Sequence, residues 1–96
     1  MGLGIYVEDL WRGRMSAFTD DEEASFMRVC ESAPEESLRF GVNKYGETLF
    51  NSIQLRQLVK ELESLPEDDR TPVVQQVVDG ARQAIHRTGY LHFIGD

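Results

Sequence analysis

The chain of 96 residues has the length of one ordinary domain and no room for a second. Hydrophobic residues make up 41% of it and charged residues 28%, which is typical of a folded globular protein rather than a disordered tail. The formal net charge of −7 disfavours binding to nucleic acid or to an anionic membrane surface, and it favours a basic protein as partner. No apolar run approaches the roughly 20 residues that span a bilayer, and the N-terminus lacks the pattern of a signal peptide, so we expect a cytoplasmic protein.

The first third of the chain contains one predicted strand and one predicted helix. Alternating apolar residues predict the strand at 3–7, and the stretch 8–18 has no clean period, which indicates a loop or an irregular extension. Thr19 and Glu22 have the spacing of a capping box, so the helix is expected to begin there, with 20–23 as its acidic first turn. We expect this helix to continue to about Ser32, before Pro34.

The middle of the chain predicts a hairpin followed by the most regular helix. Alternation at 38–42 and the return at 48–50 flank a turn at 43–46. Asn51 and Gln54 then form a second capping-box pattern, which opens a helix at 52–65. A leucine-rich stripe of this helix is expected to face the core, and the charged residues are expected to face water: Arg56, Lys60, Glu61 and Glu63.

The last third predicts a helix and a strand. Thr71 as N-cap and Pro72 at the first helical position begin the helix, and Gly89 is expected to close it in a left-handed conformation. The run at 90–94 is a strand whose Leu91 and Phe93 share one face. The predicted fold class is therefore α+β, a small and mostly antiparallel four-stranded sheet with three helices in the order β-α-β-β-α-α-β.

The sequence offers little that is typical of an enzyme. Cys30 lies in an apolar helical stripe, where a thiol usually serves as a small buried hydrophobe. His86 and His92 have no nucleophile or orienting partner that the sequence identifies. One cysteine and two histidines are too few for a compact zinc site, and no phosphate-binding or nucleophile-elbow motif occurs. We therefore expect no catalytic activity, no metal and no cofactor.

Surface chemistry is more informative, because the acidic excess is concentrated in the first half of the chain. Acidic residues surrounding aromatic anchors are what recognition of a basic protein requires. Trp11 and Tyr45 fall in predicted loops, although the alternative for Trp11 is that it packs over the sheet edge. The candidate partner-binding residues are Glu8, Asp9, Trp11, Asp20, Asp21, Glu22, Glu23, Glu35, Glu36 and Tyr45.

Two segments carry a resemblance to known proteins. They are 48–55, which opens the leucine-striped helix, and the aromatic end of the chain at 90–96. Together they resemble short acidic bacterial proteins and the immunity proteins of toxin–immunity pairs, such as those of contact-dependent growth inhibition. The resemblance implies a small cytoplasmic protein that blocks a cognate toxin, and it carries over no binding residues.

Two functions of different classes follow. The first is an immunity or inhibitor protein whose acidic surface neutralises a cognate basic toxin, in particular a nuclease, because a nuclease cleft is positive where it holds phosphates. The second is an interaction or structural subunit without enzymatic activity, associated as a homodimer through a sheet edge.

Overall fold

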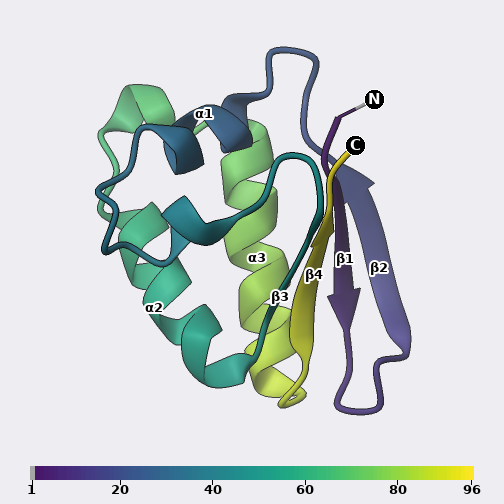
Figure 1. Ribbon diagram of the computed structural model, residues 1–96. Coiled ribbons are helices and arrows are strands. Elements are labelled where there is room, and N and C mark those ends of the chain that lie inside the picture. Colours follow the sequence, from purple (N-terminus) through teal and green to yellow (C-terminus); the bar gives the residue numbers. More distant parts are fainter. Residues whose placement is uncertain (1) are drawn as a thin grey trace.

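A four-stranded antiparallel sheet forms the frame of the molecule, which a computed structural model describes over residues 2–96. The strand order is β2-β1-β4-β3, and Figure 1 shows the helices gathered on one face of the sheet. The strands are β1 (Gly4–Glu8), β2 (Arg14–Thr19), β3 (Glu47–Phe50) and β4 (Tyr90–Ile94). The helices are α1 (Ser25–Glu31), α2 (Ser52–Glu63) and α3 (Pro72–His86), with short 3-10 helices η1 (Arg39–Gly41) and η2 (Glu67–Asp69). The predicted α+β class, with an antiparallel four-stranded sheet and three helices, is confirmed.

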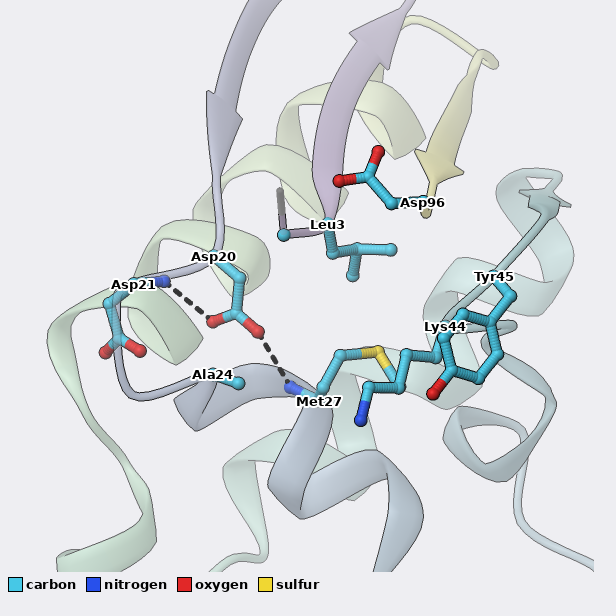
Figure 2. Close-up of a pocket in the computed structure, with 9 residues that line it drawn as sticks. Leu3, Asp20, Asp21, Ala24, Met27, Lys44, Tyr45 and Asp96 are labelled. Atoms are coloured by element: carbon cyan, nitrogen blue, oxygen red, sulfur yellow. Dashed lines mark hydrogen bonds between the residues drawn. The ribbon is translucent and has the colours of Figure 1, made fainter.

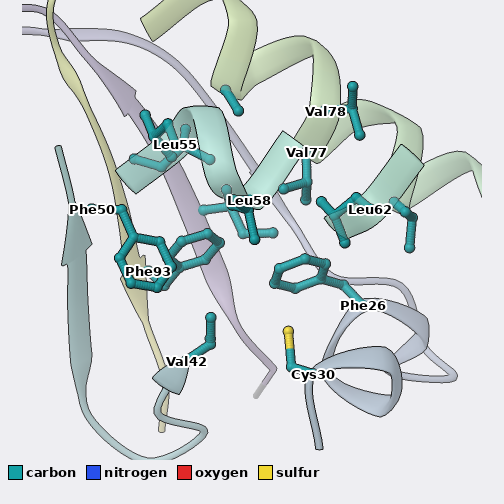
Figure 3. Close-up of a cluster of buried hydrophobic side chains, with 14 of the residues drawn as sticks. Phe26, Cys30, Val42, Phe50, Leu55, Leu58, Leu62, Val77, Val78 and Phe93 are labelled. Atoms are coloured by element: carbon teal, nitrogen blue, oxygen red, sulfur yellow. The ribbon is translucent and has the colours of Figure 1, made fainter. Parts of the chain in front are cut away.

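The core lies between the sheet and the helices. Phe93 of β4 stacks on Phe26 of α1, with ring centroids 5.5 Å apart, and meets Phe50 of β3 edge-on at 5.7 Å. Figure 3 shows these rings beside the leucine stripe of α2. Cys30 belongs to the same cluster and is buried as expected. Burial of such side chains contributes roughly 1.5–3 kcal/mol each and is the main source of stability.

The second predicted helix is confirmed together with its cap. The Asn51 side chain accepts a hydrogen bond from the Gln54 backbone, and the Gln54 side chain accepts one from the Asn51 backbone. These bonds satisfy two of the backbone groups that every helix start leaves unpaired. The helix then packs its apolar stripe against α3, which runs antiparallel to it (Figure 1).

The stretch 8–18, predicted as a loop or an irregular extension, contains most of the edge strand β2, so the observed order is β-β-α-β-α-α-β. The Asp9 carboxylate and the left-handed Arg12 shape the turn before it. An irregularity in pairing interrupts β2 opposite Val7 and Glu8. Because this edge strand is bulged and largely exposed, it lacks the alternation that marks a half-buried strand. Phe18 nevertheless packs against the core.

The first helix begins later than predicted. Thr19 ends β2 instead of capping the helix, and Ala24 adopts a left-handed conformation with φ 54°, so α1 starts only at Ser25. The Asp20 carboxylate replaces the expected cap by accepting from the backbone N–H groups of Phe26 and Met27, both at 3.0 Å. The acidic run is therefore a turn before α1 and not its first turn.

The predicted strand at 38–42 is wrong, because this segment forms η1. Glu61 of α2, expected to face water, points at it instead. Its carboxylate accepts from the Leu38 backbone at 2.8 Å and from the Arg39 backbone at 3.2 Å, and it pairs with the Arg39 guanidinium at 3.1 Å. These contacts hold the backbone in a tight turn. The returning segment is a strand, β3, and it pairs with β4.

The end of α3 also differs from the prediction in detail. Thr88, with φ 54°, is the left-handed residue rather than Gly89. Gly89 is required for another reason: a Cβ there would lie 1.9 Å from the Glu8 carbonyl oxygen. Thr71 stands at the N-cap position of α3, but its hydroxyl makes no hydrogen bond and is buried. The strand β4 is confirmed, with Leu91 and Phe93 on its buried face.

Candidate protein-binding site at the acidic end

An apolar pocket of about 310 Å³ opens beside α1, at the end of the sheet where Gly4 pairs with Ile94. Its walls are largely apolar, and carboxylates and one lysine stand around them. The lining residues are Gly2, Leu3, Asp20, Asp21, Ala24, Met27, Lys44, Tyr45 and Asp96. Figure 2 shows Leu3, Met27 and the Tyr45 ring around this α1 pocket. A hollow of this kind suits an apolar side chain, or the aliphatic stem of a basic one.

Asp20 and Asp21 shape the pocket, and their exposure differs. Asp20 is buried, and its oxygens are occupied by backbone N–H groups of the turn and of α1. Asp21 is exposed and accepts the Ser25 backbone N–H at 2.8 Å. Hydrogen bonds from the Ser25 side chain and backbone hold the pKa of the Asp21 carboxyl below its usual value. Asp21 therefore presents a stable negative charge at the rim.

A second acidic segment adjoins the first at α1. Residues of α1 and of η2 line a common groove of about 260 Å³, with Arg28 on one side and Asp68 and Asp69 on the other. We use "acidic end" for the exposed carboxylates of both segments: Asp21, Glu22, Glu23, Glu67, Asp68 and Asp69. A run of acidic residues directly before a predicted helix was the available signal, and only the fold shows where it lies.

Tyr45 and Trp11 do not form one patch. Tyr45, 74% exposed, stands in the turn before β3 at the acidic end. Trp11, 85% exposed, lies in the turn between β1 and β2, beyond the opposite end of the sheet where Glu8 pairs with Tyr90. The alternative that Trp11 packs over the sheet edge is therefore wrong, because its side chain projects into solvent.

Glu8 and Asp9 accompany Trp11 at that far end, and both are occupied by contacts within the chain. Glu8 is buried and pairs with Arg12 and with His92 Nδ1, the latter at 3.2 Å. The Asp9 carboxylate accepts the backbone N–H groups of Trp11 and Gly13. Glu8 is therefore not a surface carboxylate, contrary to its place among the predicted binding residues, because its charge is neutralised inside the protein.

Glu35 and Glu36 do not line the α1 pocket. Both are exposed in the loop after α1, and Glu36 lines an open pocket of about 470 Å³ between this loop and the end of α2. The Arg39–Glu61 pair lies at the same pocket. Of the predicted binding residues, the α1 pocket therefore brings together Asp20, Asp21 and Tyr45, with Glu22 and Glu23 in the adjoining turn.

His92 joins three strands on the sheet face opposite the helices, which sequence reasoning did not foresee. Its Nδ1 faces Glu8 of β1 and its Nε2 faces Glu47 of β3 at 2.7 Å. The Tyr6 ring lies beside the imidazole, with ring centroids 6.1 Å apart. The Arg14 guanidinium stacks on the Tyr6 ring. Because both imidazole nitrogens face carboxylate oxygens, the ring links β4 to β1 and β3 through side-chain contacts.

Neither a metal cluster nor a membrane-spanning helix is found among residues 2–96. No three or more His, Cys, Asp or Glu side chains in this part of the chain are placed to hold a metal ion. No helix in the described part combines the length and apolar character that crossing a bilayer needs.

Comparison with known proteins returned no matching family model, no matching curated protein and no matching solved structure.

Proposed function

We propose that this protein is a non-enzymatic immunity or inhibitor protein that binds and neutralises a cognate basic protein toxin through its acidic end. The observation that supports the proposal is the α1 pocket, an apolar hollow of about 310 Å³ with exposed carboxylates beside it. Interfaces of high affinity combine an anchor buried in a pocket with charges around it. Here the pocket and the charges come from two segments about 40 residues apart in the chain: 20–27, which leads into α1, and 67–69, which lies beside α1.

The chemistry of the site specifies the partner. An apolar side chain or a lysine or arginine stem fills the pocket, and cations around it face Asp21 and η2. A protein that binds phosphates, such as a nuclease, presents clustered cations of this kind, and an acidic protein competes with its substrate there. Tyr45 supplies a rigid aromatic surface at the rim.

The test is the kinetics of binding to the product of the adjacent gene, measured at low and high salt. The double variant E22K/E23K reverses two exposed charges next to the pocket. We expect its association rate to fall about tenfold or more at low salt and the difference to shrink at high salt, because rim charges steer the encounter. Tyr45→Ala should instead raise the dissociation rate, because it removes a contact of the bound complex.

The matched control is E35K/E36K, which reverses the same two charges in the loop after α1, away from the pocket. It changes net charge equally, so an effect of total charge alone would slow both variants to the same extent. Equal slowing of association in the two charge-reversed variants would refute the acidic end as the binding site. Binding kinetics that change neither with salt nor in any of the three variants would refute it as well. Asp20 and Asp21 are left unchanged because they support the fold.

A further inference from the structure

The edge strand β2 is open along its outer side. It pairs only with β1, and Figure 1 shows β2 at one border of the sheet with no element beyond it. Natural edges are usually blocked by charges or proline within the strand, or by bulges along it. The irregularity in β2 lies at its Arg14 end, and Ser16–Thr19 pair regularly with β1 and carry no charge. This stretch is a template for another strand.

Charge along this edge runs from positive to negative. Arg14 begins β2, and the acidic turn at 20–23 follows its end. An antiparallel neighbour with the same sequence reverses this order, so that its positive end lies beside the acidic turn and its acidic turn beside the positive end. A parallel copy would instead place like charges together.

The faces of β2 fix the register. Phe18 and Ser16 lie opposite Ile5 and Val7, on the helix side of the sheet, whereas Ala17 lies opposite Tyr6 on the other side. A continuous sheet requires opposed residues to share a face, as they do when Ala17 of one copy opposes Ala17 of the other. Phe18 then opposes Ser16 of the other copy.

We propose that two copies of this chain associate through β2, antiparallel about a two-fold axis at Ala17, to form one eight-stranded sheet. The association closes on itself, because each copy uses the same edge. The other edge, β3, has four residues and remains free. The groove of about 290 Å³ between β2 and α3 lies beside this axis, and its glutamines, Gln76 and Gln83, supply polar groups to the interface. This dimer uses the sheet edge and does not depend on the proposed inhibitor function.

The experiment is sedimentation equilibrium over a concentration series with two variants of the full chain. Ala17 is exposed, so Ala17→Lys and Ala17→Glu should both fold, which thermal melting by circular dichroism checks. Each places like charges directly opposite one another at the axis. We expect the parent mass to rise from 11.0 kDa toward twice that value, and each variant alone to dissociate at least tenfold more readily.

An equimolar mixture of the two variants should restore the dimer, because lysine then opposes glutamate. The control is Leu49→Lys on the exposed face of the opposite edge strand, which should leave the dimer intact. A parent that stays at 11.0 kDa at every concentration overturns the proposal. A dimer that survives both Ala17 variants also overturns the proposal. A dimer that only Leu49→Lys dissociates overturns it as well, and would place the interface at β3.

Discussion

Carboxylates that look alike in the sequence have different roles in the fold. Asp20 sits in an acidic run and is buried as the acceptor for α1, while its neighbours Glu22 and Glu23 are exposed. Glu61 lies among charged positions of a helix and is turned toward η1. Helical periodicity predicts which side of a helix is apolar, but it cannot show that a loop distant in sequence brings N–H groups to one of the charged positions.

Glu61 should make stability depend on pH. Burial by itself raises the pKa of this carboxyl, but hydrogen bonds from Leu38, Gln57 and Arg39 outweigh it and hold the pKa below the usual 4.5. A carboxyl whose pKa is lowered on folding contributes stability that is complete above the unfolded pKa and is lost as pH falls through the folded one. We therefore expect Glu61→Gln to cost about 1–3 kcal/mol of unfolding free energy at pH 7, and less as pH falls below about 4.5.

Urea unfolding from pH 7 to pH 3 measures this difference. Glu63→Gln serves as control because its pair with Arg82 is exposed, so it should change stability by less than about 1 kcal/mol. A deficit of Glu61→Gln that stays constant across the pH range would show that lost packing, rather than lost charge, causes it.

The elements that the sequence predicts well are those with local signals and a buried stripe. The capping box at Asn51 and the apolar spacing along α2 and α3 are sufficient to locate both helices. The edge strand β2 was missed because only Met15 and Phe18 among its residues are partly buried, so no alternation is visible. The segment 38–42 shows the reverse error, since its alternation satisfies a strand pattern while Glu61 fixes it as a turn.

At the junction between α3 and β4, substitutions at two neighbouring positions should change the stability of the protein in opposite directions. Thr88 holds a left-handed φ of 54°, which a β-branched residue adopts at a cost, so Thr88→Gly should stabilise the protein by roughly 1 kcal/mol. Gly89→Ala should be strongly destabilising, by more than about 3 kcal/mol, because the new Cβ would collide with the Glu8 backbone.

Thermal and urea unfolding of the two variants measure both effects. If Gly89 were instead the left-handed residue, as the sequence predicts, Thr88→Gly would bring no gain and Gly89→Ala would cost only about 1–2 kcal/mol. The sizes and signs together therefore separate the two descriptions of this junction.

Residues 2–96 form one sheet with one core, and their surface features are divided between two ends of that sheet. The α1 pocket and Tyr45 lie at one end of the sheet, and Trp11 lies beyond the other. Composition predicts the acidity, but a sequence cannot show that η2 lies beside α1, because that proximity comes from tertiary packing. Hence about half of the predicted interface gathers at the pocket.

Thiol labelling of the single cysteine measures whether α1 unfolds together with this core or separately from it. Cys30 lies on the buried side of α1, and burial raises the pKa of its thiol above the ordinary value. A thiol reagent therefore reaches it only when the protein opens. Small domains usually unfold as one unit, so the opening free energy from labelling should equal the unfolding free energy from urea. For a stability of about 5 kcal/mol or more, labelling should be at least about a thousandfold slower than in the unfolded chain.

Asp20→Ala should make the opening free energy from labelling of Cys30 smaller than the unfolding free energy from urea. It leaves the N–H groups of Phe26 and Met27 without their acceptor while the contact of α2 with α3 stays intact. We expect labelling of Cys30 to speed up more than the loss of global stability accounts for, because α1 then opens alone. Asp20→Asn keeps one acceptor oxygen and should fall between the parent and Asp20→Ala. If Cys30 of the parent instead reacts as fast as a free thiol, the placement of α1 on the core is wrong, and the α1 pocket with it.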